Sequence, residues 1–438
     1  MNDIALAQET PNSMIEIIRR SLSDIDPRLM EHGERVAYLA FQILKGHDRA
    51  LELDTKALFL LSILHDVGAY KTDEIGDMLQ FELQDVQSHA VYGYLFLCHA
   101  ADFGEAAKAV LYHHTDYADL LEKDISPETR DYAALIHLAD RIDVLTHGGR
   151  QANLNVLRAM AGKRFSPEFV DWFFEAEEQR GILRDIRTGA YRDSVDRAIQ
   201  TCRLDGNQAS EFLKMLVYAI DFRSPFTVTH TADTMAFANA LGKRMELGEA
   251  DMHALRYGAF LHDVGKIAIP VEILENPGRL TPEERAVMET HVVITGEIIA
   301  GFVPGDVYSI ACRHHEKLDG SGYPLGLTAG ELTLSERIVA VADITSALVG
   351  RRSYKLPMEK EQVLSILTQM AEQGKLDKTC CQVLEESYDA ILQEVTEDRK
   401  PIIAAYETIS RQYTEMMNRA EQRERERKAP EHGSPSDA

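Results

Sequence analysis

Histidines and aspartates recur along this 438-residue chain in an ordered series that could bind metal ions. In the second half of the chain the series runs from a single histidine, through a His-Asp pair and another histidine, to a His-His pair and a final aspartate. Its members are His230, His262, Asp263, His291, His314, His315 and Asp343. Neutral imidazoles and carboxylates together suit divalent transition metals such as Fe, Mn, Zn or Ni. The series therefore predicts a metal centre.

The adjacent pair His262-Asp263 is informative because a carboxylate has two oxygens. Asp263 could bridge two ions while His262 ligates one of them. Two metals roughly 3.5–4 Å apart can hold a bridging hydroxide and stabilise phosphoryl oxygens as they gain charge, which is the chemistry of phosphate-ester hydrolysis. Lys266 follows His262 by four residues, so on a helix it would lie one turn further on the same face. Its ammonium could there steady the attacked phosphate.

The same series occurs a second time, nearer the N-terminus. "LSILHDVGAYK" at 61–71 matches "GAFLHDVGKIA" at 258–268, and the two His-Asp pairs are 197 positions apart. The members of this first series are His32, His65, Asp66, His89, His113, His114 and Asp140. An internal repeat of this length predicts two related domains. We place them at residues 1–205 and 206–400, followed by a C-terminal helix and a disordered tail over 401–438.

The elements that must position these residues are helices. "ERVAYLAFQIL" and "ERIVAVADITSALV" place apolar residues three and four positions apart, whereas no run alternates clearly enough to indicate a sheet. The fold class predicted is therefore all-α. No apolar run approaches the ~20 residues that span a bilayer, the N-terminus lacks the pattern of a signal peptide, and the five cysteines form no CxxC pair. We expect a cytoplasmic protein without membrane contact.

The net charge of −24 argues against general nucleic-acid binding, because phosphate contacts need a basic surface. A small anionic substrate is still compatible with this charge. Metal ions or a few Lys and Arg residues would have to supply positive charge locally.

Residues 210–390 resemble the HD-GYP family, a branch of the HD phosphohydrolase superfamily. The resemblance is carried by "HDVGK" (262–266), His291, "HHEKLDGSGYPLGL" (314–327), "ERIVAVAD" ending at Asp343, and "RRSYK" (351–355). It implies tandem HD-type helical domains. It also implies a metal-dependent phosphodiesterase that converts a cyclic dinucleotide, cyclic di-GMP or 3′3′-cyclic GMP-AMP, to the linear dinucleotide in bacterial second-messenger signalling.

Carried over residue by residue, the resemblance implies that the second series ligates two divalent metal ions, Fe or Mn ahead of Ni or Zn. It implies a catalytic role for Asp263 and Lys266. The substrate contacts that it implies are Lys266, Gly322, Tyr323, Arg352 and Lys355. Two positions depart from the family pattern. Phe226 replaces the glutamate of trimetal members, which favours two metals, and Ser346 replaces a usual aspartate, which could alter base preference or rate.

The first domain resembles a plain HD domain that has kept the metal ligands and lost the substrate machinery. Ala69 stands at the position of Lys266, and "HHTDYADLL" replaces the GYP loop. Gly149 and Ala152 stand at the positions of Arg352 and Lys355. We therefore expect a regulatory or structural metal site there, the alternative being activity on a different, smaller phosphate substrate.

Two other functions fit the same residues. One is an HD-type nucleotidase or mononucleotide phosphohydrolase, and the other is a signalling adaptor that binds a cyclic dinucleotide without turnover. The intact His-Asp pair and Lys266 favour catalysis over the adaptor. The helices near "KPIIAAYETISRQYTEMM" could pack on the rest of the chain or on another subunit. A homodimer or a complex with a signalling protein is therefore compatible with the sequence.

Overall fold

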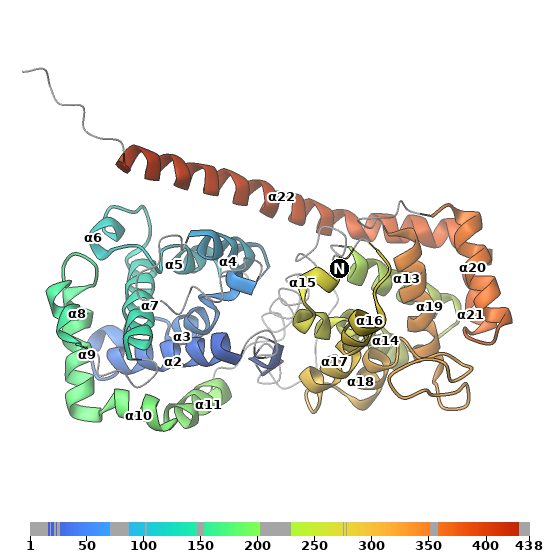
Figure 1. Cartoon of the computed structure of the whole chain (residues 1–438), viewed down its shortest axis with the longest axis horizontal. Helices are drawn as coiled ribbons and strands as arrows, with labels where there is room; N and C mark the ends of the chain where they lie inside the picture. Colours follow the sequence, from blue (N-terminus) through green and yellow to red (C-terminus); the bar gives the residue numbers. More distant parts are fainter. Residues whose placement is uncertain are drawn as a thin grey trace, which may run out of the picture. The chain divides into compact units, whose positions relative to one another are not determined.

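The computed structural model describes residues 16–17, 19–21, 23, 27–70, 87–100, 103–146, 153–201, 229–274, 276, 278–350 and 358–428. Every regular element in these ranges is an α-helix or a 3₁₀-helix (Figure 1). Extended pairing within them is limited to two isolated bridges, Ala161 with Phe165 and Asp319 with Thr328. The all-α prediction is confirmed. None of the described helices is long and apolar enough to cross a bilayer.

The chain divides into two compact units. The N-terminal unit comprises Glu31–Ala198 and Glu407–Ala438, and the C-terminal unit comprises Met1–Met30 and Ile199–Tyr406. The predicted boundary near residue 205 lies outside the described residues, so the proposed domain limits stay a prediction.

The first half of the chain forms helices of 4 to 20 residues around the first histidine series. In chain order they are α2 (Pro27–Leu44), η1 (Asp48–Leu51), α3 (Thr55–Leu64), η2 (Val67–Tyr70), α4 (Gln87–Ala100), η3 (Gly104–Ala107), α5 (Lys108–Leu111), α6 (Tyr117–Leu120), α7 (Pro127–Thr146), α8 (Asn155–Ala159), α9 (Pro167–Arg180), α10 (Ile182–Thr188) and α11 (Tyr191–Thr201). Helix α4 packs on η2 and α5, and α5 packs on α7. These contacts bring together the segments that carry the ligands.

The second half repeats this plan, with α13 and α19 (15 and 16 residues) in the positions of α2 and α7 (18 and 20 residues). In chain order its helices are α13 (His230–Arg244), α14 (Glu249–Leu261), η5 (Val264–Ala268), α15 (Val271–Leu274), α16 (Pro282–Glu289), α17 (His291–Ile299), α18 (Gly305–Cys312), α19 (Leu334–Val349), α20 (Lys360–Glu372), α21 (Lys378–Glu386) and α22 (Tyr388–Lys428). Helix α13 packs on α14 and α19, α14 packs on α18, and α17 packs on η5. Fully buried Phe237, Leu255 and Val339 belong to this core.

Helix α19 begins at a defined residue because its first turn is capped from both sides. The Thr333 hydroxyl accepts the Glu336 backbone N–H (3.3 Å), and the Glu336 carboxylate accepts the Thr333 N–H (2.7 Å). The second oxygen of buried Glu336 accepts from Arg313 (3.0 Å). Arg313 directly precedes His314, so this one carboxylate ties the start of α19 to the segment that carries the His-His pair.

A glycine after each His-Asp pair permits a close backbone approach. A Cβ at Gly265 would lie 2.1 Å from the carbonyl oxygen of His291, and a Cβ at Gly68 would lie 2.1 Å from the carbonyl oxygen of His89. Any larger residue would push η5 away from α17, or η2 away from α4. The two glycines therefore allow the His-Asp turn to lie directly against the helix that carries the next histidine.

Candidate metal centre and active site

The seven predicted ligands of the C-terminal unit lie in one cluster. Each comes from the end of a helix or from the segment beside it, except for the last aspartate, which lies within α19. The positions are His230 at the start of α13, His262 and Asp263 after α14, His291 at the start of α17, His314 and His315 after α18, and Asp343 in α19. Donor atoms from three overlapping sets of these residues lie within 4.8 Å of one another. The seven residues that are far apart in the sequence thus lie together at one site in the folded unit.

Asp263 lies at the middle of the cluster with its two oxygens directed to different histidines. Oδ2 lies 3.2 Å from Nε2 of His230 and 3.2 Å from Nε2 of His262. Oδ1 lies 3.4 Å from Nε2 of His291 and 3.9 Å from Nε2 of His314. A carboxylate that divides its oxygens between two histidine pairs has the geometry needed to bridge two metal ions.

Asp343 closes the other side of the cluster. Its Oδ1 lies 3.2 Å from Nε2 of His230, and its Oδ2 lies 3.6 Å from Nδ1 of His315. Both aspartates therefore contact His230. Between them, the two carboxylates lie within 4 Å of all five imidazoles of the cluster.

The ring orientation of three ligands is fixed by their own chain. Their Nδ1–H groups donate to carbonyls three residues earlier: His262 to Ala259 (2.7 Å), His291 to Met288 (2.6 Å) and His314 to Ala311 (2.7 Å). This tautomer directs the lone pair of Nε2 into the cluster, as in metal-ligating histidines. His262 Nε2 and Asp263 Oδ1 are buried without any hydrogen-bond partner. Buried polar atoms are rarely left unpaired, so these two atoms fit a metal pair.

Burial keeps the imidazoles of His291, His314 and His315 neutral, which is the state that ligates metals. It lowers the pKa of His291 to about 4 and that of His315 to about 3. It also lowers the pKa of His314 well below its usual range, with the neighbouring His315 adding to the effect. His230 differs. Burial alone would lower its pKa, but hydrogen bonds to the two aspartates raise it to about 9.

Asp263 is a carboxylate despite its burial. Burial alone would raise its pKa, but electrostatic interactions with His262 and with the Lys266 ammonium hold the pKa well below its usual range. The Lys266 ammonium forms a salt bridge with Oδ2 of Asp263. Our expectation that Lys266 continues the helix of His262 is wrong, because α14 ends at Leu261 and Lys266 lies in the 3₁₀-helix η5. The tighter turn nevertheless brings its ammonium to the cluster.

The GYP loop forms one wall of this site. The ring of Tyr323 lies over that of His315, with centroids 4.8 Å apart and planes at 38°. A Cβ at Gly322 would lie 2.4 Å from the Cα of Glu316, so only glycine allows the loop to fold back this closely. The peptide bond between Tyr323 and Pro324 is cis. Gly322 and Tyr323, the two predicted substrate contacts in this loop, thus lie beside the metal ligands.

The sequence does not predict the supporting roles of two further residues, Glu316 and Ser346. The buried Glu316 carboxylate accepts the backbone N–H groups of Leu325 (2.7 Å) and Leu327 (2.9 Å) and so anchors the GYP loop. The Ser346 hydroxyl lies 2.9 Å from Nδ1 of His230 and orients that ligand. Position 346 was noted only as a departure from the family. An acidic residue directly after the His-His pair was the available signal for Glu316.

Asp233 is an unusual carboxylate one turn beyond His230 on α13. It accepts from the Thr229 hydroxyl (3.0 Å) and lies 3.7 Å from Arg399 of α22. Burial raises its pKa to about 6, although Arg399, Thr229 and His230 each act to lower it. The folded protein therefore holds a proton here at a pH where an ordinary aspartate has lost it.

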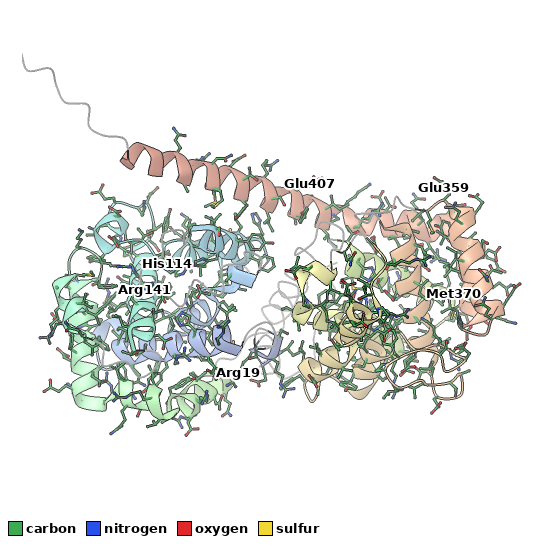
Figure 2. All side chains as sticks on the ribbon, viewed as in Figure 1. Arg19, His114, Arg141, Glu359, Met370 and Glu407 are labelled. Carbon is green, nitrogen blue, oxygen red and sulfur yellow. The ribbon has the colours of Figure 1, made fainter. Side chains whose placement is uncertain are left out.

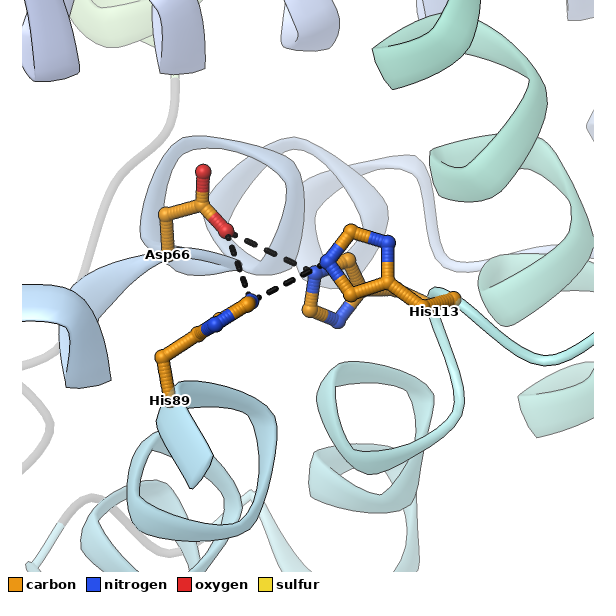
Figure 3. Close-up of side chains that lie close together, drawn as sticks. Asp66, His89 and His113 are labelled. Carbon is orange, nitrogen blue, oxygen red and sulfur yellow. Dashed lines mark hydrogen bonds and ion pairs between the residues drawn. The ribbon is translucent and has the colours of Figure 1, made fainter. Parts of the chain in front are cut away.

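The first series is also brought together, around Asp66 in the N-terminal unit (Figure 3). The predicted substrate contacts Arg352 and Lys355 lie outside the described residues, as do Phe226, Gly149 and Ala152. No geometry supports or contradicts the roles predicted for them.

The fold and both clusters define the class of protein. Residues 214–380 and residues 29–145 each match a family described as HD domain. The chain therefore contains two HD domains, which are all-α metal-dependent phosphohydrolase folds, and it is homologous to HD-GYP phosphodiesterases.

Particular relatives align across one or both domains. The 3′3′-cGAMP-specific phosphodiesterase 1 of Vibrio cholerae serotype O1 is 27% identical over 399 residues, covering 84% of this chain and 89% of that protein. The cyclic di-GMP phosphodiesterase response regulator RpfG of Xanthomonas campestris pv. campestris is 38% identical over 215 residues, 48% of this chain and 53% of that protein. The crystal structure of a cyclic GMP-AMP specific phosphodiesterase of V. cholerae, V-cGAP3, is similar in fold. Its TM-score is 0.53 at 20% identity, covering 87% of this chain and 98% of that chain.

Proposed function

We propose that the C-terminal HD domain is a metal-dependent phosphodiesterase that opens a cyclic dinucleotide to its linear form. The observation that carries this proposal is Asp263, whose two oxygens face two different histidine pairs. Five histidines and two aspartates suit a pair of first-row transition metals, and we propose Fe or Mn. Bound there, the pair would supply an activated water and Lewis-acid stabilisation of the phosphoryl oxygens.

The protein residues would position the substrate and balance its charge. Asp263 and Asp343 would hold the metal pair, and the Lys266 ammonium, already at Asp263, would face the attacked phosphate. Tyr323 would form the wall against which the substrate lies, because its ring covers His315. We propose that Arg352 and Lys355 contact the phosphates, which would give the site local positive charge in a chain of net charge −24.

The first substrate to test is 3′3′-cyclic GMP-AMP. A phosphodiesterase named for this compound aligns over 84% of the chain and therefore over both HD domains. RpfG, named for cyclic di-GMP, aligns over 48% of it. Similarity over both domains is the better guide if the first domain affects substrate choice, but cyclic di-GMP must be tested beside it.

The experiment is a product assay on the full chain loaded with Mn²⁺ or with Fe²⁺ under anaerobic conditions. Both cyclic dinucleotides are supplied together, and GMP is supplied separately to test for release of inorganic phosphate. Asp263→Asn is the inactive variant, and Asp319→Asn, which changes an exposed carboxylate in the same loop region, is its control. The proposal is supported if wild type and Asp319→Asn form linear dinucleotide and Asp263→Asn forms none. Phosphate release from GMP with both cyclic substrates intact would replace it with a nucleotidase, and binding without product would replace it with an adaptor.

A further inference from the structure

The cluster in the N-terminal unit repeats the bridging geometry of the C-terminal site. Oδ2 of Asp66 lies 3.3 Å from Nε2 of His65 and 3.7 Å from Nε2 of His32. Oδ1 lies 3.5 Å from Nε2 of both His89 and His113 (Figure 3). One carboxylate again divides its oxygens between two histidine pairs, as Asp263 does.

The donor atoms of this cluster are oriented for a ligand. Nδ1 of His65 donates to the Ser62 carbonyl (2.7 Å), and Nδ1 of His113 donates to the Val110 carbonyl (2.5 Å). Both Nε2 atoms and Oδ1 of Asp66 are fully buried without a hydrogen-bond partner. Leaving three such atoms unpaired costs about 1–3 kcal/mol each. Coordination to metal ions would satisfy all three.

The cation beside the cluster has a different position from that in the C-terminal site. Ala69, fully buried, stands where Lys266 stands in the second domain. In the part of the chain that the structure describes, no lysine forms an ion pair with Asp66. The nearby cation is instead Arg141, labelled in Figure 2, which donates to Oδ2 of Asp140 from Nη2 (2.7 Å) and Nε (3.0 Å). Among the described residues, no lysine ammonium therefore competes with metal ions for the oxygens of Asp66, and the cation acts on Asp140 instead.

A second difference lies behind the first ligand. Nδ1 of His32 donates to the Asp143 carboxylate (2.7 Å), which Arg35 fixes through two further bonds of 2.6 and 2.9 Å. In the described residues, the corresponding partner of His230 Nδ1 is the hydroxyl of Ser346. A carboxylate behind a ligating imidazole makes it more basic and fixes its orientation, and such partners change metal affinity by roughly 10–100-fold. This difference also favours tighter binding in the first domain.

Three of the first-domain ligands are also less accessible to solvent than their counterparts, whereas the bridging Asp66 (7% exposed) is similar to Asp263 (5%). The side chain of His32 is 2% exposed against 11% for His230, and that of Asp140 is 1% exposed against 8% for Asp343. His114 is 14% exposed against 22% for His315. Structural metal sites are closed whereas catalytic sites keep an open position. A chelator or a phosphate ester would reach this cluster less readily.

We propose that the N-terminal HD domain holds a resident pair of divalent transition-metal ions, bridged by Asp66, that binds more tightly and exchanges more slowly than the pair in the C-terminal domain. The ions stabilise the domain by satisfying its buried ligand atoms. The inference depends only on metal content and so stands apart from the phosphodiesterase activity.

The test follows metal loss from the full chain. Protein loaded with Mn²⁺ is dialysed against EDTA, and the manganese retained is measured over time by mass spectrometry beside the thermal unfolding temperature. We expect two phases, about two ions lost early and about two lost at least tenfold more slowly. Asp66→Asn should remove the slow phase and lower the unfolding temperature, and Asp263→Asn should remove the fast phase. Lys266→Met, which removes the competing ammonium, should slow the fast phase.

A single phase of loss in wild type, or a folded Asp66→Asn protein with the wild-type manganese content, would overturn the proposal. If Asp66→Asn does not fold, His114→Gln is the variant to read, because His114 is the most exposed of the seven ligands. It should shorten the slow phase, and an unchanged slow phase would count against the site. Because no substrate is present, this result is independent of whether the chain hydrolyses cyclic dinucleotides.

Discussion

Glu316 anchors the GYP loop, and replacing it by glutamine should loosen that loop while leaving the metal ligands in place. The carboxylate accepts two backbone N–H groups, those of Leu325 and Leu327, and its side chain is buried. A hydrogen bond to a charged group contributes about 1.5–3 kcal/mol. The amide of glutamine keeps one acceptor and turns an NH₂ group toward the other N–H. The loop should therefore lose about 3 kcal/mol of anchoring, roughly a hundredfold in the equilibrium that holds it down.

The assay compares turnover, metal content and protease sensitivity in metal-loaded protein. We expect kcat/KM for the cyclic dinucleotide to fall at least tenfold, because Tyr323 no longer lies steadily over His315. Cleavage within the loop by a nonspecific protease should accelerate, and bound manganese should stay unchanged. Glu331→Gln is the matched control. Glu331 also accepts a backbone N–H, that of Thr328 (2.9 Å), but it is exposed.

Three results would refute this reasoning. A Glu316→Gln protein with wild-type kcat/KM and wild-type protease sensitivity would show that the loop is held by other contacts. Equal damage from Glu331→Gln would show that burial of the acceptor does not matter. A loss of manganese from Glu316→Gln would mean that the residue supports the ligands themselves.

Three further predictions concern the C-terminal domain. Ser346→Ala should weaken Mn²⁺ affinity roughly 10–100-fold in a metal titration, since His230 loses its orienting hydroxyl. Gly265→Ala should lower the free energy of unfolding in urea by about 3 kcal/mol through overpacking, whereas Gly305→Ala, where an added Cβ meets no atom, should not. The raised pKa of Asp233 should cost the metal-free protein up to about 3 kcal/mol as pH rises from about 4 to about 6, because the unfolded state loses this proton first. Asp233→Asn should abolish that slope in urea unfolding measured across this range, and an unchanged slope would assign it to another group.

Much of the fold could be predicted from the sequence because helices leave a periodic signal. Apolar residues three and four apart predict helices in the stretches around α2 and α19, and both are helices. The end of α14 at Leu261 could not be predicted in this way. The chain tightens into η5 because Gly265 must approach the carbonyl of His291, and this contact joins segments distant in sequence.

The candidate site was predictable to the extent that it repeats. The order of histidines and aspartates occurs twice, and in the described residues each copy is gathered around one aspartate, Asp66 or Asp263. The residues that support the ligands leave no such signal. Ser346 contacts His230, which lies 116 positions away in the sequence. Glu316 accepts backbone N–H groups, which nearly every residue has, so the sequence does not show which of them it contacts. Side-chain chemistry repeats visibly, whereas the contacts that orient it depend on the folded backbone.

The carbonyl that orients each anchored histidine lies three residues earlier in the same stretch of chain, and this has a consequence for how such domains diverge. A short segment that ends in histidine carries its own orienting group, as at His65 and Ser62 or at His262 and Ala259. The orientation of these ligands is therefore encoded in several separate short segments. It does not depend on the loop that faces the substrate. After duplication, one copy can exchange its GYP loop and its lysine for other residues without losing the orientation of its ligands. A domain of this kind can lose its catalytic activity and still keep the geometry that binds metal ions.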